Sequence, residues 1–532
     1  MQRNLIKLFL VATLLAAPAL GIDNVTVYPS ADSSLLSQDF TMQVGGKSVP
    51  VYVERVAPQD KTARSSAMDN KAQTGQFFEE AAFAYFDMSG SAQVSVTYKS
   101  PVTTARILPA ALGIRPAIHG KTVTFTLSQP QNLTLEVNNV LVRTLQIFAN
   151  PPESEAPSPQ DPKVFVFNPG QHEVSNWQMP AGKSVIYFAP GMHTIDNLTL
   201  RDGQTLYIAG GAVVRSVIRP GARSNVFQRP GGQAETHYPE PAIAVKGSNI
   251  RIEGRGVLDG SQTLGKMLMT IEGQHISMEG IVLQDSGTWN MPIQYSDYVT
   301  VNNVKILGYR ANSDGIDVKS SRNVTIKGCY IRTLDDLIVI KTVLKNAKAP
   351  ADTDTSDHIL VQNNVLWNEV GHALSIGAEV QADVSNVEFM DNDIIHDLGR
   401  DWPMRIFLSG SGTVSITHFQ NIRVDRTHNP YLTGGKSNLI YLSILNSSWR
   451  AGEDANRALG QIKTTIFRNI DAVLSQPGTP PLKARIDLVG ASNASGVDGV
   501  LFDNITIDGK PMSAANTAIT QRFATKVTGL PK

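Results

Sequence analysis

The chain has 532 residues, in which 47 Lys and Arg balance 47 Asp and Glu, and it contains one cysteine. A neutral total without a long block of like charge disfavours a nucleic-acid partner, because phosphate binding needs a concentrated basic face. Cys329 alone excludes an internal disulfide, and a chain of this length can bury enough surface to fold without one.

The segment 1–21 is predicted to be a secretory signal peptide. Arg3 and Lys7 precede an apolar run that starts at Leu8, and small residues follow this run. The run is too short to span a bilayer, and no later segment has the roughly 18 uninterrupted apolar residues that a transmembrane helix needs. We therefore expect an exported protein, periplasmic or extracellular, that does not insert into the membrane.

Residues 22–150 are predicted to form a β-sandwich domain. Segments such as "AQVSVTYKS", "KTVTFTLSQ" and "NLTLEVNN" alternate apolar and polar residues at period two, and Gly, Pro and Asn separate them. About eight antiparallel strands are expected at the spacing that is usual for such domains. The proline-rich stretch 151–163 that follows predicts a stiff, exposed linker.

Residues 164–532 are predicted to form a parallel β-helix, because a short motif recurs along them. An apolar residue, one or two polar ones, a Gly or Asn and another apolar residue appear in "IRIEGRGV", "ISMEGIVL", "VTVNNVKIL" and "VTIKGCYI", and again downstream. The first Gly or Asn markers stand at 254, 280, 303 and 328. Such intervals favour a stacked rod over propeller blades of about forty residues. A repeated Asn at a bend can hydrogen-bond its neighbour in the next coil.

Three aspartates fall on neighbouring coils of the predicted rod. Asp314 and Asp335 are 21 residues apart, close to one coil, so they should lie side by side, and Asp336 follows directly. Like charges held this close raise at least one pKa, so that an acid and a base can coexist, as glycoside hydrolysis requires. Aspartates are also common in turns, so the clustering alone leaves a purely structural interpretation open.

Further candidates lie at a similar phase of the coils. His372 occupies a Gly-flanked turn in "NEVGHALSIGAEV", and Arg405 begins a strand in "DWPMRIFLSGSG". Together the coils would line one groove, which suits a linear polysaccharide or oligosaccharide. Trp289 and Trp402 are candidates to stack on sugar faces, although a core role is as good an interpretation of either. From the coil after Arg405, Tyr431 or Tyr441 would reach the groove.

The motifs "NSDGIDV", "LDDLIVIKT", "VGHALSIG" and "RIF" resemble, in this order, those of the polygalacturonases, glycoside hydrolase family 28. The resemblance covers roughly residues 240–425. It implies a right-handed parallel β-helix of the pectin lyase type, an inverting mechanism, and neither a metal nor an organic cofactor.

The resemblance also implies roles for the site residues. Asp335 would be the general acid, and Asp314 with Asp336 would position and deprotonate the attacking water. His372 would support the protonation of the acid and contact sugar hydroxyls. Arg405 would bind substrate beside the cleavage point.

This chain departs from the family at several positions. Phe407 stands where the family has a lysine that helps to bind the galacturonate carboxylate, and losing such a charge-assisted contact costs about 1.5–3 kcal/mol. A pectic backbone is therefore less favoured than the motifs alone suggest. Ala373 and Leu334 replace glycines, and the insertion 343–357 is expected to build a wall over the groove.

Three alternatives remain open at this point. A β-sandwich ahead of a β-helix with three aspartates is also similar to the dextranase and isopullulanase family, glycoside hydrolase family 49, which cleaves neutral α-glucans. A β-helix that binds glycans without cutting them would need no shared patch of acids. A polysaccharide lyase would need a basic residue such as Lys341 or Arg405 to remove a proton.

Overall fold

The computed structural model describes residues 24–58, 78–228, 234–346, 352–397, 402–425, 436–450, 453, 456–475 and 481–531. The predicted signal peptide lies outside these ranges. Within them no helix is both long enough and apolar enough to cross a membrane. The regular structure consists of β-strands and three short 3-10 helices, η1 (Ser33–Leu35), η3 (Ala110–Leu112) and η4 (Ser448–Arg450). The predicted all-β class is confirmed.

The N-terminal part is a β-sandwich, as predicted, but with eleven described strands in place of about eight. Strands such as "AQVSVTY" bury every second side chain, which places the apolar residues between the two sheets. Both sheets are antiparallel except where β11 runs parallel to β5. One sheet contains β1 (Val25–Thr26), β4 (Tyr52–Val56), β5 (Glu79–Met88), β7 (Ala105–Leu108), β10 (Gln131–Val137) and β11 (Leu145–Asn150), and the other β2 (Phe40–Val44), β3 (Lys47–Val49), β6 (Ala92–Tyr98), β8 (Ala117–His119) and β9 (Thr122–Leu127).

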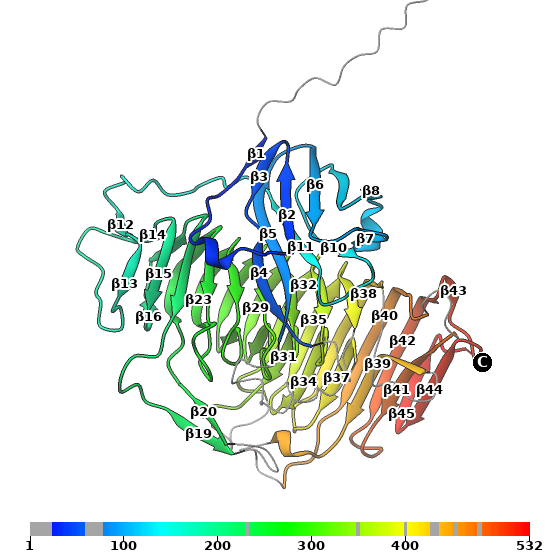
Figure 1. The fold of residues 1–532 in the computed structure, drawn as a ribbon. Helices are drawn as coiled ribbons and strands as arrows, with labels where there is room; N and C mark the ends of the chain where they lie inside the picture. The colour runs from blue at the N-terminus through cyan, green and yellow to red at the C-terminus, as the bar shows by residue number, and fades with distance from the viewer. Residues whose placement is uncertain are drawn as a thin grey trace, which may run out of the picture.

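From β12 onward the chain winds into a right-handed parallel β-helix, also as predicted (Figure 1). Each coil adds one strand to each of three faces, which we name after one of their strands. The β31 face holds β16 (Leu198–Leu200), β25 (Met291–Gln294), β28 (Ile316–Lys319), β31 (Ile338–Thr342), β34 (Leu374–Val380), β37 (Met404–Leu408), β39 (Lys436–Ile444), β41 (Lys483–Val489) and β44 (Thr517–Arg522).

The other two faces continue each coil. The β29 face holds β12 (Val164–Phe167), β14 (Val185–Phe188), β17 (Thr205–Ile208), β26 (Asp297–Asn302), β29 (Arg322–Lys327), β32 (Ser356–Gln362), β35 (Val384–Met390) and β45 (Ala524–Thr528). The β30 face holds β13 (Gly170–His172), β15 (Gly191–Ile195), β18 (Ala212–Ser216), β22 (Val257–Asp259), β24 (Val282–Gln284), β27 (Lys305–Leu307), β30 (Tyr330–Thr333), β33 (Val365–Asn368) and β36 (Asp393–Asp397).

Five longer strands bend from one face to the next. The first two run from the β31 face into the β29 face, and the last three run from the β29 face into the β30 face: β21 (Ile243–Gly254), β23 (Met269–Glu279), β38 (Val414–Val424), β40 (Ile462–Ala472) and β42 (Val497–Ile507). A hairpin of β19 (Asn225–Gln228) and β20 (Ala234–His237) and the short β43 (Lys510–Pro511) complete the described strands.

The repeated Asn at the coil bends forms the ladder that the sequence predicts. Asn421, Asn469 and Asn504 all have a positive φ, which Asn tolerates better than most residues. The amide of Asn504 donates to Asn469, and that of Asn469 donates to Asn421, each at 2.8 Å. These bonds tie successive coils together. Inward-facing Ile, Val, Leu and Phe side chains fill the rod.

The sandwich lies along the β30 face of the rod (Figure 1). Tyr52 and Phe148 of the sandwich belong to one buried apolar cluster with Tyr330 and Trp367 of the rod. The predicted linker 151–163 is mostly exposed, but the Pro151 carbonyl accepts a hydrogen bond from Arg255 at 3.0 Å, so its first residue is bound to the rod.

Candidate active site

Strand pairing on the β31 face places the candidate residues in one column. Ile316 pairs with Ile338, Ile338 with Leu374, and Leu374 with Met404. Counting back two residues from each strand start, and from Met291 of β25, gives Trp289, Asp314, Asp336, His372 and Trp402 on successive coils.

This register corrects one detail of the sequence prediction. Asp336, and not Asp335, stands directly next to Asp314, because the coil between them contains 22 residues. Asp335 is one position earlier in the same turn. The prediction that the three aspartates share a patch is confirmed, since one carboxylate oxygen of each lies within 4.8 Å of the others.

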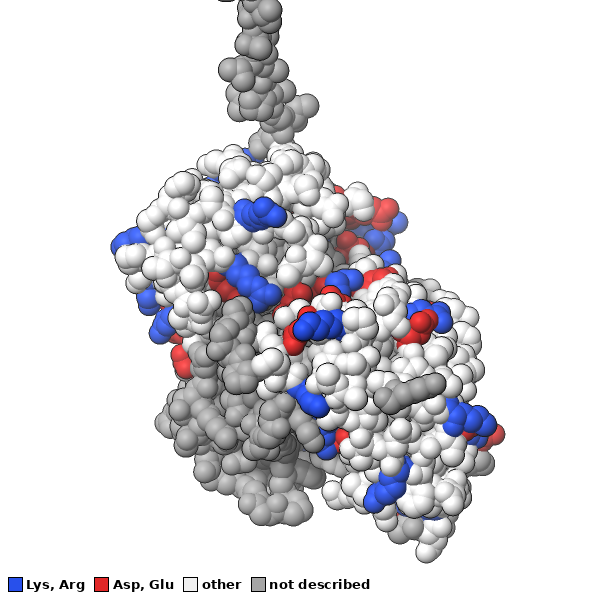
Figure 2. Space-filling model, turned by 90° about the vertical axis from the view of Figure 1, so that its right-hand side faces the viewer, with Lys and Arg blue, Asp and Glu red and all other residues white. Residues whose placement is uncertain are grey.

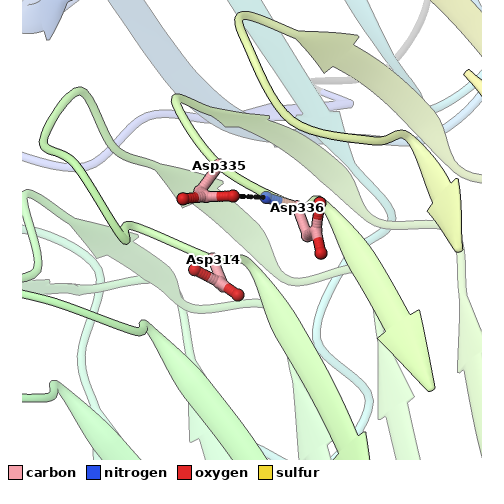
Figure 3. Close-up of side chains that lie close together, drawn as sticks. All are labelled: Asp314, Asp335 and Asp336. Carbon is pink, nitrogen blue, oxygen red and sulfur yellow. Dashed lines mark hydrogen bonds between the residues drawn. The ribbon is translucent and has the colours of Figure 1, made fainter. Parts of the chain in front are cut away.

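The turns that hold the acids are fixed by short-range contacts. The Asn290 amide donates to the Asp314 carbonyl at 3.0 Å, and the Asp336 backbone N–H donates to Asp335 at 3.0 Å (Figure 3). A Cβ on Gly371 would lie 2.6 Å from the Asp336 nitrogen, so only glycine allows this close approach of the next coil. Asp314 and Asp336 are buried, whereas Asp335 is half-buried and can be reached from outside.

Asp336 is the acid that is held ionised. It accepts hydrogen bonds from His372 Nδ1 at 2.5 Å and from the His372 backbone N–H at 3.0 Å. Arg405 Nη1 lies 2.8 Å from His372 Nδ1, so a guanidinium cation supports the pair. Burial alone would raise the pKa of Asp336, but His372, and after it Arg405 and Lys341, bring this pKa well below its ordinary value.

The other two acids shift the opposite way. Burial, and after it the charge of Asp336, raises the pKa of Asp335. Burial and the neighbouring Asp317 raise the pKa of Asp314 well above its ordinary value. The cluster therefore combines one carboxyl group of lowered pKa with two of raised pKa, which is the difference between base and acid that acid–base chemistry needs.

Lys341 forms a clamp that sequence analysis did not assign. Its Nζ lies 2.7 Å from Asp317 and 3.3 Å from Asp314, and 4.2 Å from the ring centroid of Trp289. The sequence did contain a signal for this contact. In "IDVK" and "IVIKT" inward and outward side chains alternate, which puts Asp317 and Lys341 on the same outer side of adjacent strands.

The same clamp bears on the lyase alternative. Burial opposes the charge of Lys341, but Asp317, Glu379 and Asp314 outweigh it and raise its pKa well above the ordinary value. Lys341 thus stays protonated and is a poor base. Arg405 is equally unsuited, because a guanidinium does not lose its proton in proteins.

A stacked pair of aromatic rings lies at the Trp402 end of the column. Trp402 is buried and stacks on Tyr441 with ring centroids 4.8 Å apart. The guanidinium of Arg485, which the sequence analysis did not single out, lies 5.0 Å from the Trp402 ring, and that of Arg405 lies 4.8 Å from the ring of Phe407. Tyr431, the other predicted tyrosine, lies outside the described residues.

The described parts of the insertion 343–357 lie away from the three acids. Val343 accepts hydrogen bonds from Tyr295 and Ser320, and Lys345 Nζ lies 4.1 Å from the Tyr295 ring. These contacts are at the turn between the β31 and β29 faces, whereas the acids precede the β31 face. Residues 347–351, on which the predicted wall also depends, lie outside the described residues.

A hard divalent cation is the group that the acids could hold, because carboxylate oxygens are its preferred ligands. The Lys341 ammonium already contacts Asp314 and the His372 ring contacts Asp336, so protein side chains occupy part of the space and supply part of the charge that such an ion would bring. Cys329 lies in the turn between β29 and β30 and is free and buried.

Comparison with known proteins agrees with this geometry. The model of glycosyl hydrolases family 28 matches residues 242–436, which include all three aspartates, His372 and Arg405. The matched residues are therefore similar to the family 28 glycosyl hydrolases. A polygalacturonase of Chamaecyparis obtusa is 24% identical over 250 residues, which are 45% of this chain and 43% of that protein. The chain thus matches less than half the length of this curated relative.

Two solved structures share the fold of this chain. Dex49A from Penicillium minioluteum superposes with a TM-score of 0.53 at 14% identity and covers 93% of both chains. An exopolygalacturonase from Thermotoga maritima superposes with a TM-score of 0.50 at 17% identity, over 65% of this chain and 83% of that one. At these identities the likeness establishes a common architecture.

Proposed function

We propose that this chain is a glycoside hydrolase that cleaves α-linked bonds of a polysaccharide or oligosaccharide. The observation that carries the proposal is the set of three clustered carboxyl groups whose pKa values shift in opposite directions. The family 28 match and the polygalacturonase relatives support the same reaction class. A purely glycan-binding rod has no need for acids arranged in this way.

In the proposed mechanism Asp335 is the general acid. It is the most accessible of the three, and its raised pKa keeps a proton available for the glycosidic oxygen that leaves. Asp336, held ionised by His372 and Arg405, accepts the proton of the attacking water. Asp314 retains its own proton and orients the water by a hydrogen bond, so we assign the role of base mainly to Asp336.

We propose that the reaction inverts the anomeric centre. The spacing of the acids has to be compared with that of inverting and retaining enzymes. Carboxyl groups about 5–5.5 Å apart are typical of retaining enzymes, and inverting pairs are usually about 6.5–9.5 Å apart. The oxygens here lie within 4.8 Å, so we place the water beside the pair Asp314 and Asp336 and not between two opposed groups. NMR of the first product formed identifies its anomer, and a retained configuration would contradict this arrangement.

The substrate is proposed to be pectic, in line with the named relatives. Arg405 and Arg485 offer two cations on the β31 face within two coils of each other, although Phe407 replaces the expected lysine. A neutral α-glucan is the second candidate, because an aromatic ring at 407 and the stacked pair Trp402 and Tyr441 suit the apolar face of an uncharged pyranose.

The deciding experiment incubates the protein with polygalacturonic acid, dextran and pullulan and measures new reducing ends. We expect release from one of these polymers by the native chain and a loss of release in Asp335→Asn. Unsaturated products that absorb in the ultraviolet would indicate a lyase instead. Equal release by Asp335→Asn and the native chain would contradict the mechanism.

We also propose that residues 1–21 direct export and that 22–150, 151–163 and 164–532 are the sandwich, linker and rod. The basic and apolar pattern of the first segment supports the former, and the change in strand pairing at Val164 supports the latter. Cell fractionation with N-terminal sequencing of the exported protein tests the first boundary. An uncleaved cytoplasmic chain would contradict it.

A further inference from the structure

A ladder of outward-pointing residues runs along the β29 face, on a different side of the rod from the three aspartates. At one position of each coil the backbone has a positive φ and the side chain projects from the sheet. Strand pairing puts His275, Tyr298, Asn323, His358 and Asn386 at this position on five successive coils. Three of these five rungs carry rings, and Asn323 separates the third ring from the first two.

The rings define a slot in this ladder. His275 and Tyr298 stack with centroids 5.0 Å apart and an interplanar angle of 9°, so their planes cross the long axis of the rod. The other face of Tyr298 looks toward the rung of Asn323, and His358 stands one rung beyond. Two rungs span about 9.6 Å, which leaves room for one pyranose ring in van der Waals contact with a ring on either side.

The floor and ends of the slot are held in place. The Asn323 amide donates to Asp297 at 2.7 Å, which keeps this short side chain low between the two rings. His358 Nδ1 pairs with Asp357 at 2.6 Å, which fixes the imidazole. Tyr298 is 55% exposed, and the His358 side chain is 65% exposed, so both rings are available.

The chemistry of the lining is polar and uncharged apart from histidine. Ser277, Thr300 and Thr325 line the same hollow, and none of its lining residues is a Lys, Arg, Asp or Glu. Hydroxyl and amide groups beside exposed rings match the hydroxyls and the apolar face of a sugar. They do not match a phosphate or another strongly charged ligand. On the end of the molecule that Figure 2 shows, Lys and Arg side chains are mixed with Asp and Glu side chains, so no large patch of one charge forms there.

The geometry points to a second glycan-binding site at Tyr298, which holds an extended polysaccharide chain on the β29 face without cleaving it. One pyranose of the chain sits between Tyr298 and His358, and its neighbours leave the slot across the rod, parallel to the ring planes. Such a site would keep the protein on a polymer between cleavage events.

Affinity electrophoresis in native gels that contain polygalacturonic acid, dextran or pullulan tests the site. Tyr298→Ala is compared with Ile416→Ala, a control at the same ladder position whose side chain is 44% exposed and has no ring. All variants are made in the Asp335→Asn chain to limit cleavage, and again with Arg405→Ala to weaken the other binding site. The reducing-end assay is run separately on the catalytically intact Tyr298→Ala.

We expect Tyr298→Ala to lower the apparent affinity for one polymer about threefold to tenfold in both backgrounds. Ile416→Ala should leave it unchanged, 0.5 M salt should have little effect, and turnover of short oligosaccharides by Tyr298→Ala should equal that of the native chain. Equal migration of Tyr298→Ala and its parent in every gel would overturn the inference. An effect abolished by salt would overturn it too. If no substrate is cleaved, the proposed hydrolase fails but the gels still decide this site.

Discussion

Buried charges occur in two regions of this molecule, and they are arranged differently. Where the sandwich meets the rod, Arg332 lies 2.8 Å from Glu369 and 3.9 Å from Glu54, with all three side chains at most 2% exposed. In the acid column Lys341 is shared between two carboxylates, and within the described residues Asp335 forms no ion pair. In the first arrangement both carboxylates lie near one buried cation, whereas in the second Asp335 has no such partner within the described residues.

The two regions are connected through one turn. Arg332 lies three residues before Asp335 in the chain, and its partner Glu369 lies three residues before His372. The buried pair thus stands behind the turns that present the acid and its neighbour. We infer that the sandwich helps to support the candidate active site, because Glu54 comes from the sandwich. Substitutions in the first region should change stability, and substitutions in the second should change activity.

The largest expected effect is that of Asp335→Asn. Removing the general acid should lower kcat about 10²- to 10⁴-fold. The thermal midpoint should stay the same, because an uncharged amide of similar size replaces a carboxyl group that carries its proton. Reducing-end kinetics and a thermal melt measure the two quantities. A large fall in the midpoint together with the loss of activity would show that Asp335 mainly stabilises the fold.

Arg332→Met should have the next largest effect, now on stability. It leaves Glu54 and Glu369 buried without their cation, which should cost about 3–5 kcal/mol of unfolding free energy. Urea denaturation measures the loss. Arg322→Met is the matched control, because Arg322 is exposed and lies 3.8 Å from Asp297, a surface pair worth about 1 kcal/mol or less. Equal effects of both substitutions would contradict the distinction.

Arg405→Ala should act mainly on substrate binding. The guanidinium contacts His372 beside the acid cluster, where we expect it to bind substrate, so its loss should raise KM about tenfold with a smaller fall in kcat. Arg405→Lys should recover only part of the loss, because an ammonium lacks the planar fork. A fall in kcat as large as that of Asp335→Asn at unchanged KM would assign Arg405 to the chemical step.

Glu54→Gln should give the smallest change, visible in the pH dependence of stability. Burial raises the pKa of Glu54 to about 7, although Arg332 and Gln146 oppose the shift. The folded state therefore binds more protons than the unfolded one between the ordinary value and pH 7, so stability falls as pH rises through this window. Glu54→Gln should flatten that fall in thermal melts between pH 5 and 7. An unchanged slope would contradict the assignment.

Much of this architecture is predictable because it repeats. The Gly and Asn markers reveal the coils, since a bend of positive φ restricts residue choice in every turn, as at Asn421 and Asn469. The acids, His372 and Arg405 could be placed near one another from coil spacing alone. Their exact register could not be predicted. One extra residue in the coil places Asp336, and not Asp335, next to Asp314.

Contacts between distant segments were beyond sequence reasoning. Nothing in the local pattern around Glu54 indicates that it meets Arg332, which lies in another domain. Arg485 was missed for the same reason, since its contact with Trp402 depends on how the later coils stack. Lys341 was closer to prediction, because strand alternation shows its side, but its pairing needed the register of two adjacent coils.

The central claim is that the pKa values of Asp335 and Asp336 shift in opposite directions. The pH dependence of kcat/KM tests this most directly, because it reports the pKa values of the essential groups of the free enzyme. Measured on the polymer that the native chain cleaves, it should be bell-shaped. Activity should fall on the alkaline side as Asp335 loses its proton, at a pH above the ordinary aspartate pKa of about 4. A rate that rises steadily with pH from 4 to 8 would contradict a protonated Asp335 beside an ionised Asp336.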